Sequence, residues 1–101
     1  MPFVEVSTTD DPKPGYGKVV YANEIAIALF NLDGEFYAID NTCPHQGGPL
    51  GEGEVYENES VICPHHGYQF DIRTGGPVSF PRGVKKYNVK VEDGKVFVEV
   101  E

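Results

Sequence analysis

The cysteines and histidines of this chain of 101 residues are confined to two short stretches. One stretch reads Cys43-Pro44-His45, the other reads Cys63-Pro64-His65-His66-Gly67, and no cysteine or histidine lies elsewhere. An ordinary core would scatter such residues, whereas a metal centre gathers soft thiolate and imidazole ligands from neighbouring loops. The spacing, C-x-H followed by C-x2-H, therefore predicts two loops that bind a metal together.

The rest of the sequence predicts an all-β fold, because apolar residues alternate with a period of two and no segment has a helical period. Residues 25–30 and 35–40 are expected to pair around the turn 31–34. Residues 87–92 and 95–101 are expected to pair around Asp93-Gly94, which can adopt the positive φ angles of a two-residue turn. Phe97 is expected on the wet face, beside a neighbour. Shorter strands are expected at 3–6, 18–22, 61–62 and 69–72.

Glycine and proline concentrate in loops at about 41–53, 63–68 and 74–81. Irregular loops on a small β scaffold are common places for a functional site. The length fits one domain, residues 1–101, with one core and one site.

The formal charge of −8 argues against a nucleic-acid partner, whose phosphates would be repelled. The charge suits a protein that docks weakly on basic partners. Four acids, Glu52, Glu54, Glu57 and Glu59, lie between the two Cys/His stretches, either on a solvated hairpin or in a position to steer a partner. The chain has no run of about 18 apolar residues and no secretory signal, so we expect no membrane contact and a cytoplasmic location.

The two stretches resemble the Rieske signature in both ligand spacing and loop separation. The run from Cys63 to Asp71, followed by Thr74-Gly75, is similar to the second Rieske loop and the strand that leaves it. Residues 77–81 are similar to the third loop, which covers the cluster in that family. The resemblance extends over essentially the whole chain.

The resemblance implies one [2Fe-2S] cluster, with Cys43 and Cys63 on one iron and His45 and His66 on the other. It also implies a Rieske-like fold of small antiparallel sheets with a cluster-binding tip built from loops. Symmetry between the two Cys-Pro-His copies would nominate His65 as the ligand, but the family pattern selects His66. His65 would then be an exposed neighbour of the cluster, a docking contact or a modulator of its potential.

Other interpretations of the two stretches remain open at this point. A disulfide between Cys43 and Cys63 would leave the clustered histidines unexplained. A mononuclear zinc site is a stronger alternative, although zinc sites usually begin with cysteines two to four residues apart. A catalytic Cys–His pair has no recognisable orienting acid. With His45 and His66 committed, the chain has too few ligands for a second iron site, so we expect no enzyme activity of its own.

The leading functional hypothesis is an electron-carrier ferredoxin that passes electrons from a flavin reductase to a terminal oxygenase or similar acceptor. The alternatives are a small electron-transfer subunit of a nitrite reductase-like enzyme and a zinc-stabilised interaction module. The respiratory family members carry a further disulfide and a serine after the His-Gly of the second loop, whereas Tyr68 occupies that position here. We therefore expect a midpoint potential in the lower part of the Rieske range, and a monomeric carrier.

Overall fold

The computed structural model describes residues 2–43, 48–65, 67–78 and 82–100. It contains ten β-strands and one short 3₁₀ helix among these residues. The strands are β1 (Phe3–Thr8), β2 (Tyr16–Ala22), β3 (Ile25–Leu32), β4 (Glu35–Asp40), β5 (Glu54–Tyr56), β6 (Ser60–Ile62), β7 (Gln69–Asp71), β8 (Lys86–Tyr87), β9 (Val89–Glu92) and β10 (Lys95–Glu99), and the helix is η1 (Leu50–Glu52).

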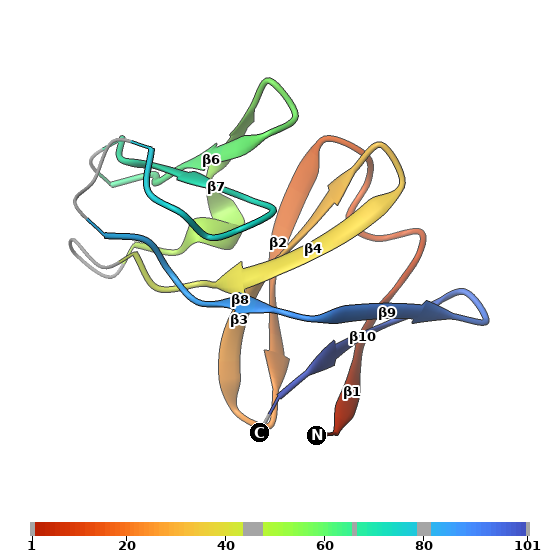
Figure 1. Ribbon diagram of the computed structural model, residues 1–101. Coiled ribbons are helices and arrows are strands. Elements are labelled where there is room, and N and C mark those ends of the chain that lie inside the picture. The colour runs from red at the N-terminus through yellow and green to blue at the C-terminus, as the bar shows by residue number, and fades with distance from the viewer. Residues whose placement is uncertain (1, 44–47, 66, 79–81, 101) are drawn as a thin grey trace.

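The strands form three antiparallel sheets, in the orders β1-β10-β9, β2-β3-β4-β8 and β5-β6-β7. The four-stranded sheet lies in the middle, with the β1-β10-β9 sheet on one side and the small β5-β6-β7 sheet on the other (Figure 1). The all-β architecture expected from the alternating pattern is therefore confirmed.

Strand β3 is apolar at nearly every position because each of its faces covers a different core. Ile27 and Leu29 pack into a cluster shared with Val96 and Val98 of β10. Ala28 and Phe30 point the other way, into a cluster shared with the small sheet. A strand that is buried on both faces needs apolar residues at consecutive positions, not only at alternate ones.

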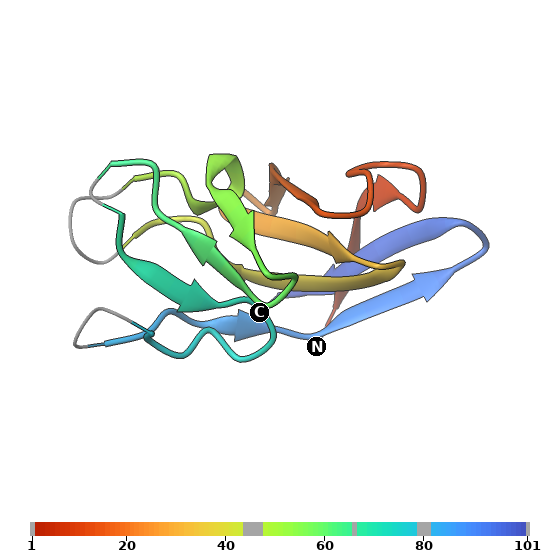
Figure 2. The same ribbon diagram turned by 90° about the horizontal axis from the view of Figure 1, so that it is seen from above.

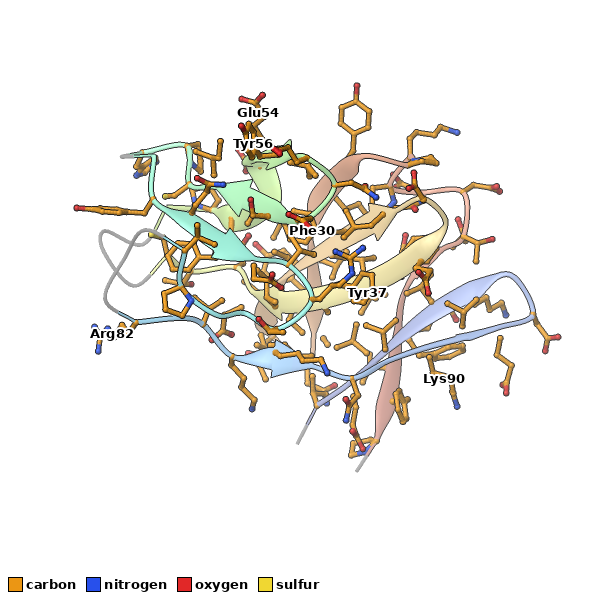
Figure 3. All side chains as sticks on the ribbon, turned by 45° about the horizontal axis from the view of Figure 1, so that its top comes forward. Phe30, Tyr37, Glu54, Tyr56, Arg82 and Lys90 are labelled. Carbon is orange, nitrogen blue, oxygen red and sulfur yellow. The ribbon has the colours of Figure 1, made fainter. Side chains whose placement is uncertain are left out.

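Gly17 makes room for Phe30, one of two fully buried phenylalanines described in the second core, which is the cluster shared with the small sheet. It lies opposite Phe30 in the β2–β3 ladder, and a Cβ at this position would come within 2.4 Å of the Phe30 ring. Any side chain larger than hydrogen would therefore displace a fully buried ring. Phe30 lies between the central sheet and the small sheet, whose strands β6 and β7 are joined by the second Cys/His loop (Figure 3).

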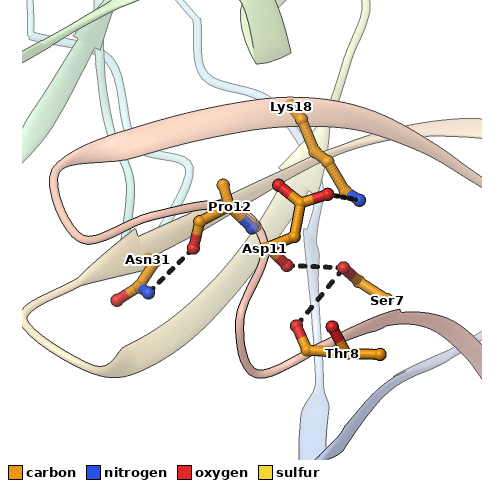
Figure 4. Close-up of polar contacts among 6 residues, drawn as sticks. All are labelled: Ser7, Thr8, Asp11, Pro12, Lys18 and Asn31. Atoms are coloured by element: carbon orange, nitrogen blue, oxygen red, sulfur yellow. Dashed lines mark hydrogen bonds and ion pairs between the residues drawn. The ribbon is translucent and has the colours of Figure 1, made fainter.

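The long connection between β1 and β2 is held by the buried side chain of Asn31. Its Nδ2 donates to the Pro12 carbonyl at 2.9 Å, and its Oδ1 accepts the Gly34 N–H at 2.7 Å. Lys18 and Asp11 form an exposed ion pair nearby, at 2.6 Å (Figure 4). The buried amide satisfies the backbone of two connections at once, whereas the surface ion pair contributes little to stability.

The expected hairpins are present with adjusted ends. The 31–34 turn is shorter than predicted, because Asn31 and Leu32 still pair with Phe36 and Glu35, so that β3 continues to Leu32. Asp93 and Gly94 have φ angles of 52° and 74°, as the two-residue turn requires. The predicted 87–92 strand is interrupted at Asn88, where the chain leaves the central sheet as β8 and joins the outer sheet as β9.

Two elements of the structure, η1 and β5, were not predicted from the sequence. Strand β5 has only one half-buried residue, Val55, which pairs with Val61 of β6. The pairing of β5 with β6 makes the acidic 54–60 segment a hairpin. This agrees with the interpretation that its acids lie on a solvated hairpin. Phe97 is half-buried and lies under the Lys90 ammonium, so it has the expected neighbour. The described residues contain no helix that could cross a membrane.

Candidate metal centre

The strands β4, β6 and β7 deliver both Cys/His stretches to one end of the molecule. The first stretch follows β4, and the second connects Ile62 of β6 with Gln69 of β7. Figure 2 shows the loops after β4 and β6 and before β8 at the end opposite the β9–β10 turn. The topology therefore brings together three loops that are far apart in the sequence.

The two stretches form loops of equal size, closed by the same kind of bond. The Cys43 N–H donates to the Gly48 carbonyl at 3.0 Å, and the Cys63 N–H donates to the Tyr68 carbonyl at 2.7 Å. In each case the amide of the cysteine bonds to the carbonyl five residues later. The repeated Cys-Pro-His motif therefore begins two equivalent loops, and each cysteine is held at the neck of its loop.

The two loops touch at Gly48. A Cβ on this residue would lie 2.8 Å from the Cys63 Sγ and 3.1 Å from the His65 Cγ. The first loop can approach the second this closely only because Gly48 has no side chain. Gly48 thus couples the neck of one loop to the cysteine of the other.

Both cysteines are buried, with exposed fractions of 1% for Cys43 and 2% for Cys63. They belong to one apolar cluster with Leu50, Phe70 and other residues of the second core. They are not joined to each other by a disulfide, so the disulfide interpretation is wrong. Two buried sulfur ligands on adjoining loops suit a soft metal centre.

The predicted histidines are divided between described and masked parts of the chain. His65 is described and exposed, beside the contact between the loops. His45 and His66 lie outside the described residues, as do residues 79–81 of the predicted third loop. Among the residues that are described, no group of three or more histidine, cysteine or acidic side chains gathers around a common point.

Asn41 holds the stem of the first loop, a role that the sequence pattern did not reveal. Its Oδ1 accepts the Gly51 N–H at 2.8 Å, and its carbonyl accepts the Leu50 N–H at 2.7 Å. Thr42 and Pro49 then form a bridge one step closer to Cys43. The loop therefore stands on a short ladder that begins at the end of β4, and its only sequence signal is an asparagine directly after a buried strand.

Tyr87 and Asp40 brace the same stem from the side. The Tyr87 hydroxyl donates to the Asp40 Oδ1 at 2.8 Å, and the Asp40 N–H donates to the Lys85 carbonyl at 2.9 Å. Burial raises the pKa of Tyr87 to about 12, with the hydrogen bond to Asp40 and the charge of that carboxylate adding to the effect. The segment that follows the third loop is thus fixed to the strand that leads to Cys43.

The described residues fit an iron–sulfide cluster in two respects. Two buried sulfur atoms come from loops that meet at Gly48, and each loop is closed by its own backbone. Mixed cysteine and histidine ligation is an established way to hold a two-iron cluster. A cluster bound by such residues would supply a site that accepts and releases one electron.

Comparison with known proteins gives a consistent result. The family model for the Rieske [2Fe-2S] domain matches residues 2–96. The 3-phenylpropionate/cinnamic acid dioxygenase ferredoxin subunit of Photorhabdus laumondii is 40% identical over 91 residues, which cover 88% of this chain and 85% of that protein.

Solved structures agree with the sequence comparison. The ferredoxin of carbazole 1,9a-dioxygenase from Nocardioides aromaticivorans superposes with a TM-score of 0.93 at 29% identity, covering 100% of both chains. A carbazole 1,9a-dioxygenase ferredoxin in complex with its oxygenase gives 0.86 at 29% identity, over 98% of this chain and 97% of that one. A nitrite reductase small subunit from Mycobacterium tuberculosis gives 0.89 at 26% identity, over 99% and 96%.

Proposed function

The chain belongs to the Rieske [2Fe-2S] domain family, and from this we propose that it is a one-electron carrier that serves an oxygenase. The observation that supports this most directly is the pair of buried cysteines on two equivalent loops that meet at Gly48. The domain spans residues 1–101, with cluster loops at about 41–53, 63–68 and 74–81, and holds one cluster.

The proposed ligands are Cys43, His45, Cys63 and His66. When bound, the cluster supplies a site that accepts and releases one electron. The chain holds both thiolates in an apolar core, fixes each loop through a cysteine amide, and lets the loops approach at Gly48. Burial of the cysteines keeps water from the sulfur side of the site, which protects a centre of this kind from loss.

The proposed partners follow from the relatives. Proteins with this fold and with 29% to 40% identity are named as ferredoxins or ferredoxin subunits of dioxygenases, and one was solved in complex with its oxygenase. We therefore infer a flavin reductase as donor and a terminal oxygenase or similar acceptor, with catalysis in those components. A monomeric carrier in the cytoplasm is the simplest form.

A role as the small subunit of a nitrite reductase-like enzyme is the second candidate. The likeness to the Mycobacterium tuberculosis protein supports it, but that identity is lower than that of the dioxygenase ferredoxin subunit. A zinc-stabilised module has less support, because the matching family model is that of an iron–sulfur domain.

The deciding experiment is EPR of the anaerobically purified, dithionite-reduced protein, with iron and sulfide analysis. We expect a rhombic signal with a low average g value and equal amounts of iron and sulfide. A colourless protein that contains zinc would contradict the proposal.

The ligand assignment is tested by three serine variants. His45→Ser and His66→Ser are expected to lose the visible spectrum or change it. His65→Ser is the matched control, since it removes an imidazole from the same loop, and is expected to keep the parent spectrum. Loss of the spectrum in His65→Ser with retention in His66→Ser would reverse the assignment.

A further inference from the structure

The positive charges of this acidic chain are concentrated in one segment. Residues 72–91 contain five cationic side chains and no acid, whereas all sixteen acids and the other three cations lie elsewhere. The cations of the segment are Arg73, Arg82, Lys85, Lys86 and Lys90. A carrier with a formal charge of −8 therefore has one strongly basic segment.

Three of these cations lie close together in the sequence, directly after the third loop. We call them the basic strip and define it as Arg82, Lys85 and Lys86. All three are exposed. The ammonium of Lys85 lies 5.0 Å from the centre of the Tyr87 ring. Among the described residues the one ion pair joins Lys18 and Asp11, so no described carboxylate forms an ion pair with the strip.

Backbone bonds fix the basic strip to the site. The Val84 N–H donates to the Gly75 carbonyl at 2.7 Å, which ties the strip to the segment that leaves β7. The Lys85 carbonyl accepts the Asp40 N–H, and Asp40 ends the strand that leads to Cys43. The side chain of Val84 packs against the core that contains both cysteines. A partner that contacts the strip would therefore be close to the cluster.

Glu54, one of the acids between the two Cys/His loops, lies on a different side of the molecule. Glu54 of β5 projects from the side of the small sheet, whereas Arg82 lies along the side on which β8 and β9 run (Figure 3). The two sides therefore present opposite charges to an approaching protein. Such an asymmetry orients a molecule in the field of its partner before contact.

We propose that the basic strip docks on an acidic surface patch of a protein redox partner. This inference rests on the proposed electron-carrier function and deepens it. Charge complementarity determines the occupant, since three exposed cations attract carboxylates. A nucleic acid or an anionic membrane is a poorer fit, because either would present its charge over a wide area to the acidic remainder of the chain. In the docked state one electron passes from the reduced carrier to the oxidised partner, and no bond is made or broken.

The test uses the cluster-loaded protein and two electron acceptors of known charge. Plastocyanin, a copper protein with an acidic surface patch, is the acceptor that the basic strip should attract. Cytochrome c, whose surface presents lysines, is the acceptor of opposite charge. The second-order rate of oxidation of the reduced carrier is measured by stopped flow between low and high salt. The variant is Lys85→Glu/Lys86→Glu. The control is Lys13→Glu/Lys95→Glu, which changes the net charge equally at two exposed lysines away from the strip.

We expect the wild-type rate with plastocyanin to fall as salt rises, although the carrier is acidic overall, because local attraction exceeds net repulsion. The strip variant should react about 10-fold more slowly at low salt, and the control less than about 3-fold more slowly. With cytochrome c neither variant should react more slowly than the wild type.

Equal losses in the two variants, or a wild-type rate that rises with salt, would overturn the inference. Sedimentation of the wild type but not the strip variant with phosphatidylserine vesicles would also overturn it, in favour of a membrane. The visible and EPR spectra of each variant keep the two proposals distinct. An intact signal with equal rates rejects only the strip, whereas absence of the signal in the wild type rejects the carrier function.

Discussion

At the scale of single residues, Gly48 is the described position at which the first loop meets the cysteine of the second. An added methyl group would lie 2.8 Å from the Cys63 Sγ, so either the sulfur or the first loop must move. We expect Gly48→Ala to reduce cluster incorporation at least about 2-fold, since strained contacts of this kind cost about 1–3 kcal/mol. The ratio of visible to protein absorbance of the purified protein measures the effect.

The matched control is Gly34→Asn in the β3–β4 turn. Gly34 has a φ of 94°, and a Cβ there meets no atom within 4 Å. Asparagine tolerates positive φ better than most residues, so this variant should keep full cluster content. Wild-type incorporation in Gly48→Ala would show that the loops do not depend on this contact.

Tyr87 gives the chain a specific dependence on alkaline pH. Burial raises the pKa of its hydroxyl to about 12, above the ordinary value of 10.0, and Asp40 adds to the shift. The folded state therefore holds this proton more tightly than the unfolded state. The resulting stabilisation is complete below pH 10 and is lost as the pH rises from 10 towards 12.

A difference titration isolates this group. The tyrosinate absorbance of the wild type minus that of Tyr87→Phe should show a midpoint near 12. Asp40→Asn removes the carboxylate but not the burial, so it should shift the midpoint downwards by only part of the difference. A midpoint at the ordinary tyrosine value in the wild type would contradict the burial of Tyr87 and its contact with Asp40.

At the scale of elements, the stem of the first loop depends on Asn41. Asn41→Ala would leave the N–H of the buried Gly51 without its acceptor, which should lower the free energy of unfolding by about 1–3 kcal/mol. Asn41→Asp keeps an oxygen acceptor and should lose less. The measurement is the urea midpoint of the cluster-loaded protein, followed by far-ultraviolet circular dichroism. Equal urea midpoints for Asn41→Ala and the wild type would show that the Asn41 side chain does not stabilise the stem of the first loop.

The sequence predicted the elements whose own residues carry the pattern. Strand β3 is marked by its run of apolar residues and β10 by alternation, and Asp93-Gly94 marks its turn without help from the rest of the chain. Strand β5 could not be foreseen, because an isolated Glu-Val-Tyr has little preference and becomes a strand only by pairing with β6. The interruption of the predicted 87–92 strand at Asn88 arises because β8 and β9 belong to two different sheets, and the local sequence pattern cannot show this.

At the site, the motif predicted the two cysteines and the loops that carry them. It did not predict the residues that hold these loops in place. Cys43 and Cys63 were identified because thiols and imidazoles cluster in the sequence. Asn41 and Tyr87 act through contacts across the fold, and neither residue type is diagnostic by itself. Gly48 stands among several glycines, and only its distance from Cys63 distinguishes it.

At the scale of the whole molecule, reduction adds a negative charge to a chain that already carries −8. Salt screens the repulsion between that charge and the exposed acids, so higher ionic strength should favour the reduced form. We expect the midpoint potential to rise by on the order of tens of millivolts between low and high salt, within the lower part of about −150 to +300 mV. Protein-film voltammetry at several salt concentrations tests both statements. A midpoint well above zero or one that falls with salt would contradict them.

The two closed loops and their contact at Gly48 also have a kinetic consequence. Each cysteine is fixed where a backbone hydrogen bond closes its loop, and both cysteines lie in a close-packed core. The surrounding atoms therefore have little freedom to shift when the site gains an electron and its charge changes. A small nuclear displacement means a low reorganisation energy for electron transfer. The packing around the site therefore favours fast electron transfer, whichever protein delivers the electron.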